Sequence, residues 1–380
     1  MRKKHIIMAA AIAATTVAVP GGAAQGAEGD EWRVIRPVVT LPKRDLRDVE
    51  AVSAEEVWIA GYQYTSESAY FPILQRWNGE NWRAYNPKGI GTEGQLFDLS
   101  AAGPNDVWVA GVREEDDETG LTDTYLGHWD GTAWTEVEAP PVNQGSQRLR
   151  HLAADGDGLW LAEANGRVFR REGATWTPHL DLGKRVITFD SLPSGEAWLR
   201  TQDSLHRWDG SAWSQVALPA GASLAYLQVN DTDGAWVTTG TGLAVWRDGA
   251  WQETPFPAEY QNARTVTASG GYWIYLRDDS KEGWVRWTGS DWEITSDLPQ
   301  NTPGKQVMTD TAGRIWGIAY AYVPFLETSG KLVRYEGGKW ETVPGLPRAL
   351  YRMRAIPGTD KSIAVGVDAV TGDLKAITNG

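Results

Sequence analysis

The stretch Trp-Asp-Gly-Thr-Ala-Trp at residues 129–134 decides the fold, because the rest of the chain repeats it. An Asp-Gly or Asn-Gly pair between aromatic and apolar residues is the strongest short-range signal for a β-hairpin. Each copy is therefore expected to join two antiparallel strands, with the flanking aromatic residues forming a cross-strand pair. Further copies lie at residues 77–82, 208–213 and 287–292, looser ones at 171–176 and 335–340, and a variant at 246–251.

Around each hairpin the chain repeats a longer unit of four predicted strands. An inner apolar strand comes first, then a polar turn, then a second strand that carries a tryptophan, as in Val-Trp-Ile-Ala-Gly at 57–61 and Val-Trp-Val-Ala-Gly at 107–111. The hairpin supplies strands three and four. Four-stranded units of about 40–45 residues are typical of β-propeller blades. The predicted inner strands span residues 48–53, 96–102, 149–154, 187–192, 224–229, 264–269, 306–311 and 351–356.

The chain contains eight inner strands but only seven complete units. The last unit, formed by residues 350–380, ends where its outer strand should begin, and residues 30–38 carry the missing outer-strand tryptophan, Trp32. The N-terminal strand is therefore expected to complete the last blade and close the ring, which removes exposed sheet edges. These observations predict an all-β, eight-bladed β-propeller with four antiparallel strands per blade, over residues 28–380. A seven-bladed ring is the alternative and requires one unit to be misread.

Residues 1–27 are expected to be a secretory signal peptide. Arg2, Lys3 and Lys4 precede an apolar stretch over residues 6–19, and a run of small residues follows Pro20. The apolar part is too short for a transmembrane span, so we expect cleavage between Ala23 and Glu28 and an extracellular product. An ordinary amphipathic N-terminal helix is the alternative.

Charge and composition narrow the range of partners. The formal net charge is −13, and removal of residues 1–27 would make it −16. An acidic surface repels nucleic acid and anionic lipid, so neither nucleic-acid binding nor membrane insertion is expected. The chain has no cysteine, and a hydrophobic core must therefore hold it together. Most of its 21 tryptophans fall at repeated blade positions, which assigns them to the scaffold rather than to a ligand.

Catalytic and cofactor signals are weak. The histidines do not have the spacing of metal ligands, and neither a nucleophile elbow nor a phosphate-binding glycine loop is evident, so no catalytic residue and no cofactor is predicted. The segments 155–158 and 230–234 resemble part of a calcium loop but lack its closing glutamate, which favours plain turns and leaves a metal there open. The hairpin lacks the spacer residue of sialidase boxes, and the chain lacks the adjacent cysteines of many quinoprotein dehydrogenases.

The repeat resembles that of a group of secreted, Trp-rich actinobacterial propellers. Their blades read Asp-Val-Trp-x-x-Gly and then His-Trp-Asp-Gly-Thr-x-Trp, as at residues 106–111 and 128–134 of this chain. The resemblance covers essentially residues 30–380. Some members look like the lectin-type propeller subunits of umbrella toxin particles. The resemblance thus implies a propeller that sits on a larger secreted assembly and recognises a target surface.

Departures from the repeat mark a candidate binding face. The connections between second and third strands are long in blades 7, 1 and 2, and ring closure makes these blades neighbours across blade 8. Insertions on one face of a repeat protein often form its binding surface, and exposed aromatic rings suit sugar faces or protein hot spots. The candidate residues are Tyr62, Tyr64, Tyr70, Phe71, Tyr320, Tyr322, Phe325, Glu114 and Asp116.

The architecture and these residues predict a non-catalytic recognition protein. The resemblance adds that it is lectin-like, with a glycan or other cell-surface ligand and further secreted subunits as partners. Three alternatives remain open at this stage. The long connections could only cover blade edges. The chain could be a carbohydrate-active enzyme that uses paired carboxylates at the mouth of the channel. It could also be a protein–protein scaffold.

Overall fold

Every copy of the repeated hairpin pairs its two flanking residues in the computed structural model. Trp129 lies opposite Trp134, and the Oδ1 of Asp130 accepts the backbone N–H groups of Thr132 and Ala133 at 2.8 and 2.9 Å. Gly131 has a φ of +93°, a conformation that glycine adopts without a steric penalty. The remaining pairs are Trp77 with Trp82, Arg171 with Trp176, Trp208 with Trp213, Trp246 with Trp251, Trp287 with Trp292 and Tyr335 with Trp340.

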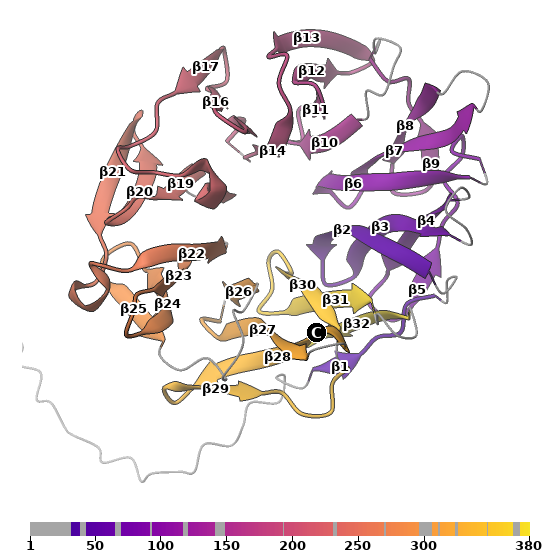
Figure 1. The fold of residues 1–380 in the computed structure, drawn as a ribbon. Helices are drawn as coiled ribbons and strands as arrows, with labels where there is room; N and C mark the ends of the chain where they lie inside the picture. Colours follow the sequence, from indigo (N-terminus) through magenta and orange to yellow (C-terminus); the bar gives the residue numbers. More distant parts are fainter. Residues whose placement is uncertain are drawn as a thin grey trace, which may run out of the picture. The chain divides into compact units, whose positions relative to one another are not determined.

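These hairpins are the outer halves of eight four-stranded antiparallel sheets, which form an eight-bladed β-propeller (Figure 1). In Figure 1 the first strand of each blade, for example β6 or β22, lies innermost. The structure describes residues 32–38, 43–64, 70–91, 93–116, 121–140, 149–192, 194–230, 234–269, 271–295, 306–310, 312–323, 326–347, 349–367 and 373–380. The predicted leader, residues 1–27, lies outside these ranges.

The strands of blades 1 to 4 follow one another in the chain. Blades 1 and 2 consist of β2 (Lys43–Ser53), β3 (Glu56–Tyr64), β4 (Tyr70–Trp77), β5 (Trp82–Ala84), β6 (Gly94–Gly103), β7 (Asp106–Asp116), β8 (Leu121–Trp129) and β9 (Trp134–Glu136). Blades 3 and 4 consist of β10 (Leu149–Ala154), β11 (Leu159–Glu163), β12 (Arg167–Glu172), β13 (Thr175–Asp181), β14 (Val186–Ser191), β15 (Ala197–Thr201), β16 (Leu205–Trp208) and β17 (Trp213–Val216).

Blades 5 to 8 continue the pattern and include two short 3₁₀ helices. Blades 5 and 6 consist of η1 (Leu224–Tyr226), β18 (Gln228–Asn230), β19 (Gly234–Thr238), β20 (Gly242–Arg247), β21 (Ala250–Pro255), η2 (Ala258–Tyr260), β22 (Arg264–Ser269), β23 (Trp273–Arg277), β24 (Glu282–Trp287) and β25 (Trp292–Thr295). Blades 7 and 8 consist of β26 (Gln306–Thr309), β27 (Ile315–Val323), β28 (Leu326–Glu336), β29 (Lys339–Thr342), β30 (Leu350–Ala355), β31 (Ser362–Val367), β32 (Leu374–Thr378) and β1 (Arg33–Val34).

The N-terminal strand closes the ring as the repeat predicts. β1 pairs antiparallel with β32, so that Arg33 lies opposite Thr378 and Val34 opposite Ile377. The Arg33 guanidinium also donates to the carbonyl oxygen of Gly380 at 2.9 Å from NH2. Blade 8 is therefore built from both ends of the propeller, and the prediction of eight blades with an N-terminal closing strand is confirmed.

One hydrophobic cluster fills each interface between neighbouring blades. The second-strand tryptophan points toward the next blade, where the indole of Trp58 meets the hairpin rings Trp129 and Trp134 at centroid distances of 5.3 and 5.1 Å. Trp160 contacts Trp208 and Trp213 in the same way. Blade 8 has Ile363 at this position, and it packs against blade 1. The tryptophans are thus mainly scaffold residues, because burying such rings is a large source of stability.

An acidic residue and a cation hold many of these indoles in place. Trp58 donates from Nε1 to Glu56 at 2.8 Å, and Arg76 pairs with the same carboxylate while lying 5.7 Å from the indole centroid. In blade 2 the cation position belongs to His128, whose ring stacks on Trp108 at 4.1 Å. His128 Nε2 also lies 2.9 Å from an oxygen of Asp106. His128 thus occupies a repeat position of the blade scaffold.

The glycine three residues after the tryptophan permits a bulge in the first strand. A Cβ on Gly61 would collide with the carbonyl oxygen of Asp45, and one on Gly111 would collide with that of Gln95. The register between β2 and β3 shifts at this level, between Leu46 and Asp48, and leaves Arg47 unpaired in the ladder. The motif Trp-x-x-Gly therefore sets the register of the first strand on either side of the bulge.

Two sequence expectations need correction. The predicted inner strand at residues 224–229 begins only at Gln228, because residues 224–226 form η1, whose N-cap residue Ser223 accepts a hydrogen bond from Ala225 N. The long connections of blades 1, 2 and 7 are extensions of the strands rather than loose insertions. Among the described residues, no helix has the length and hydrophobicity needed to cross a membrane.

Candidate recognition site

Three hairpins rise above the others at one end of the propeller. Because strands one to four are antiparallel neighbours in each blade, all turns between second and third strands lie at the same end as the connections between blades. The two strands of this hairpin have eight to eleven residues in blades 1, 2 and 7. In blades 3 to 6 they have four to six. The hairpin end therefore has a raised part near blades 7, 1 and 2.

The raised hairpin of blade 1 gathers three tyrosine rings. Tyr64 lies directly opposite Tyr70 across β3 and β4, with ring centroids 5.8 Å apart. Tyr62 packs edge-on against Tyr70 at 5.5 Å and lies 6.4 Å from Tyr64. Tyr64 and Tyr70 are half-buried, so each keeps part of its ring open to solvent. Aromatic rings fixed in this way form a contact surface that loses little conformational entropy on binding.

Tyr62 supports this surface from below. Its side chain is buried, with 9% of the residue exposed, and the sequence-based interpretation of Tyr62 as an exposed anchor needs correction to that extent. Its hydroxyl accepts a hydrogen bond from Arg47 NH2 at 2.7 Å and donates to Asp45 Oδ2 at 3.1 Å. Burial raises the pKa of Tyr62, the hydrogen bond from Arg47 opposes that shift, and the charge of Asp45 adds to it. Tyr62 therefore stays neutral and links the hairpin to the bulge of β2.

Arg47 and Asp45 add charged groups beside the tyrosines. They form an ion pair at 3.1 Å, and each side chain is 43% exposed. The Arg47 guanidinium also lies 5.2 Å from the centroid of Tyr62, a cation–π distance. Aromatic faces flanked by hydrogen-bonding charges suit both carbohydrate and peptide ligands. The sequence did not single out these two residues, because only the β2 bulge brings them to the hairpin.

For most of the other candidate residues the structure describes only the backbone. Phe71 lies in β4 opposite Gln63 and is half-buried. The backbones of Glu114 and Asp116 belong to β7, and those of Tyr320 and Tyr322 to β27. Their side chains and the whole of Phe325 lie outside what the structure describes. The structure thus brings Tyr62, Tyr64 and Tyr70 together, and the remaining candidates stay predictions.

The innermost strands β2 and β6 (Figure 1) carry a pair of carboxylates, Asp48 and Asp98, that the sequence reasoning did not identify. Asp48 Oδ2 accepts the backbone N–H of Leu99 at 3.0 Å, and Asp98 Oδ2 accepts that of Leu152 at 2.6 Å. Each aspartate therefore ties its own blade to the next. Burial raises the pKa of Asp98 well above its usual range, and the neighbouring charge of Asp48 raises it further. The two aspartates follow the first-strand bulge at equivalent positions of blades 1 and 2. That equivalence was the only feature of the sequence that could have identified the pair.

The loop at residues 155–158 is a turn held by an ion pair. Asp155 Oδ1 accepts the backbone N–H groups of Asp157 and Gly158, and Asp155 Oδ2 pairs with Arg170 at 2.7 Å. Residues 231–233 of the second calcium-like loop are not described. Within the described part of the chain, no cluster of three or more histidine, aspartate or glutamate side chains has the arrangement of a metal site.

Comparison with known proteins supports the fold. No family model and no curated protein matches the chain. The structure titled "YCF48 bound to D1 peptide" matches with a TM-score of 0.53 and 15% identity, over 93% of this chain and 96% of that one. YCF48 from Cyanidioschyzon merolae matches with a TM-score of 0.50 and 13% identity, over 91% and 98%. At such identities the likeness establishes a shared fold and nothing more.

Proposed function

We propose that this chain is a secreted, non-catalytic recognition propeller that binds its ligand at the tyrosine hairpin of blade 1. One observation carries the proposal: Tyr64 and Tyr70 lie half-exposed in a fixed cluster, at a raised hairpin beside the charged pair Arg47 and Asp45. The blade repeat does not require these tyrosines, because the hairpins of blades 3 to 6 are shorter and form the same four-stranded sheet without them.

A glycan is the ligand class that we favour. Partly exposed aromatic rings pack well against sugar rings, and a neighbouring arginine and carboxylate can hydrogen-bond to sugar hydroxyl groups. The resemblance to Trp-rich actinobacterial propellers supports the same class and adds the proposal that the chain serves as a targeting subunit of a larger secreted toxin assembly. Secretion itself rests on the pattern of residues 1–27.

Glycan-array binding tests this proposal directly. The full chain should bind a subset of surface glycans, and the double variant Tyr64→Ser/Tyr70→Ser should lose that binding while its melting temperature stays close to that of the parent. A matched control is Tyr226→Ser, which alters a tyrosine of η1 in the blade 4–5 connection. Binding that survives the double variant would exclude the hairpin. The YCF48 structure has a peptide as its ligand, so a peptide array should be screened in parallel.

The neighbouring carboxyl groups of Asp48 and Asp98 favour a second candidate function, that of a carbohydrate-active enzyme. A carboxyl with a raised pKa beside a second carboxyl is the kind of pair that general acid–base chemistry uses. The hydrogen bonds from Leu99 and Leu152 favour a structural role instead, since each already engages one oxygen of its carboxylate. Polysaccharide turnover that disappears in Asp98→Asn would establish the enzyme. Glycan binding without turnover would support the recognition protein.

A further inference from the structure

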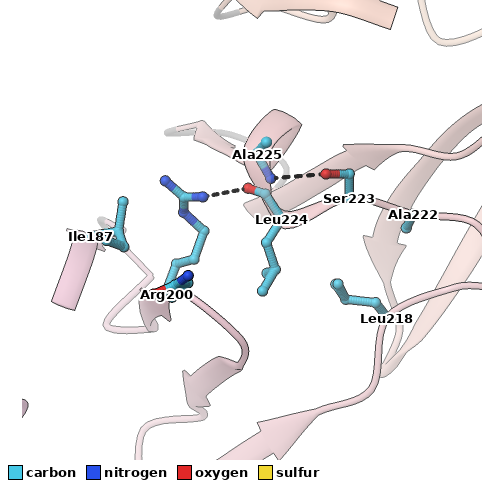
Figure 2. Close-up of a pocket in the computed structure, with 8 residues that line it drawn as sticks. Ile187, Arg200, Leu218, Ala222, Ser223, Leu224 and Ala225 are labelled. Carbon is cyan, nitrogen blue, oxygen red and sulfur yellow. Dashed lines mark hydrogen bonds between the residues drawn. The ribbon is translucent and has the colours of Figure 1, made fainter. Parts of the chain in front are cut away.

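A separate cavity of about 480 Å³ lies between blades 4 and 5 (Figure 2). By strand order, its lining residues lie at the end of the blades that carries the turns between second and third strands, as the tyrosine hairpin does. Its wall combines aliphatic side chains with the polar residues Gln202 and Ser223. Ile187 comes from the start of β14, and Leu218, Ala222 and Leu224 come from the connection that leads into blade 5. The volume is within the range of pockets that hold a small molecule or the terminal residue of a larger one.

One guanidinium, that of Arg200, is the charged group in this cavity wall. Arg200 lies in β15, and its NH1 donates to the carbonyl oxygen of Leu224 at 2.6 Å, as Figure 2 shows. Among the described residues, the other N–H groups of the two terminal nitrogens have no acceptor. The Nε is shielded from solvent and likewise has no partner in the described part of the chain. The bond to Leu224 holds the guanidinium across the cavity.

The charge of Arg200 is not compensated. Arg170 in blade 3 pairs with Asp155, and Arg207 in blade 4 pairs with Glu196, but no carboxylate of the described residues pairs with Arg200. Burial lowers the pKa of Arg200, and no acidic residue acts in the opposite direction. Arg200 is half-buried, and a partly desolvated cation without a counter-charge costs free energy. In a chain with a net charge of −13, this is an unusual place for positive potential.

We propose that the cavity binds a carboxylate carried on an apolar group. The planar guanidinium matches a carboxylate geometrically and would form charge-assisted hydrogen bonds with it. Ile187, Leu218 and Leu224 would take up an aliphatic side chain. A sugar acid fits less well, because the lining includes no aromatic ring. A free aliphatic acid and the C-terminal residue of a peptide share this chemistry, and the site is independent of the proposed tyrosine hairpin site.

Calorimetric titration of the full chain with N-acetyl-leucine tests the site, with N-acetyl-leucinamide as the uncharged control. We expect the acid to bind and the amide to bind at least about tenfold more weakly, the loss typical of one charge-assisted contact. Arg200→Gln should lower the affinity for N-acetyl-leucine by a similar factor, because glutamine can still donate to the carbonyl oxygen of Leu224 but carries no charge. Equal binding of acid and amide, or no binding of the acid, would overturn the proposal.

Two further variants separate binding from folding. Ala225→Trp fills the cavity from an exposed position of η1, and should abolish binding while the melting temperature is retained. Arg264→Gln removes an exposed positive charge of blade 6 outside the cavity, and should change the affinity less than twofold. Unchanged binding in Ala225→Trp would refute the location.

A hexapeptide that ends in leucine, compared as acid and as C-terminal amide, then identifies the source. Peptide acid that binds at least about tenfold tighter than N-acetyl-leucine assigns the site to a peptide C-terminus. Equal affinity assigns it to a free acid.

Discussion

The indole of Trp32 lies edge-to-face against that of Trp316, with ring centroids 5.2 Å apart and planes at 75°. These residues are far apart in the chain and belong to blades 8 and 7. Trp32 therefore does for the last blade what Trp134 does for blade 2: it receives the second-strand tryptophan of the preceding blade. Ring closure thus depends on a side-chain contact as well as on the two-residue ladder between β1 and β32.

Removing this contact should destabilise the whole ring. Trp32→Ala should lower the free energy of unfolding by about 3 kcal/mol, because it removes a buried aromatic ring and leaves a cavity. Deletion of residues 28–38 should cost more, because it also exposes the edge of β32 and promotes aggregation. Chemical denaturation and light scattering check both. If the deletion variant unfolded at the same denaturant concentration as the parent, closure would not depend on β1.

Asp98 should make the protein less stable as the pH rises, the reverse of the usual effect of an aspartate. The pKa of Asp98 is raised in the folded protein, so between its unfolded value near 4 and its folded value the native state binds more protons than the unfolded state. The contribution of Asp98 to stability is therefore greatest below pH 4 and declines as the pH rises through that window.

Asp98→Asn should remove this decline and leave the protein at least as stable as the parent at pH 7. The asparagine oxygen can still accept the N–H of Leu152, and no charge is buried beside Asp48. Unfolding curves of parent and variant between pH 4 and 8 measure the difference. A variant that is less stable than the parent at pH 7 would show that Asp98 is ionised and well paired in the native state.

The hairpin turns should show the opposite pH dependence. Hydrogen bonds from Thr132 and Ala133 lower the pKa of Asp130 to about 2. Its contribution to stability is therefore complete above its unfolded value near 4 and is lost as the pH falls toward 2. Asn78 makes the same backbone bonds in blade 1 without a charge. Asp130→Asn should thus preserve the turn at pH 7 and lose less stability in acid than the parent, which thermal melts at pH 2.5 and 7 can compare.

Blade 2 offers a stabilising substitution. His128 lies where Arg76 and Arg286 lie in blades 1 and 6, over the second-strand tryptophan. Arginine keeps its charge at every relevant pH, whereas an imidazole is charged only in acid. His128→Arg should therefore pair permanently with Asp106 and raise stability by about 0.5 kcal/mol at pH 8, a modest gain because both groups are partly exposed. No gain at pH 8 would indicate that ring stacking on Trp108 matters more than charge.

The sequence was sufficient to predict the features that depend on local turn chemistry or on the number of repeats. The turn at residues 129–134 follows from Asp130 and Gly131 alone, and blade number and closure follow from the repeat and its missing strand. The contacts of Arg47 with Tyr62 and of Arg200 with Leu224 could not be predicted. The first contact depends on a strand bulge and joins residues separated by 15 positions in the chain. The second depends on an inter-blade connection and joins residues separated by 24 positions. Likewise η1 replaces half a predicted strand because Ser223 caps it, which apolar periodicity does not reveal.

The tyrosine hairpin allows binding and folding to be separated within one cluster. Tyr64→Ser and Tyr70→Ser should each change stability by less than about 1 kcal/mol, because both rings are only half-buried. Each should weaken ligand binding by about 1–3 kcal/mol, the effect of losing an anchoring ring.

Tyr62 should behave differently from its two neighbours. Tyr62→Phe keeps the ring but removes the hydroxyl that accepts from Arg47 and donates to Asp45. It should lower the free energy of unfolding by about 1 kcal/mol. It should weaken ligand binding only if loss of the hydroxyl moves Arg47 out of its place beside the hairpin. Melting temperature and affinity measured on the same three variants distinguish these roles. If Tyr62→Phe abolished binding while Tyr64→Ser and Tyr70→Ser bound normally, the ligand would contact the Arg47 side of the hairpin rather than the rings of Tyr64 and Tyr70.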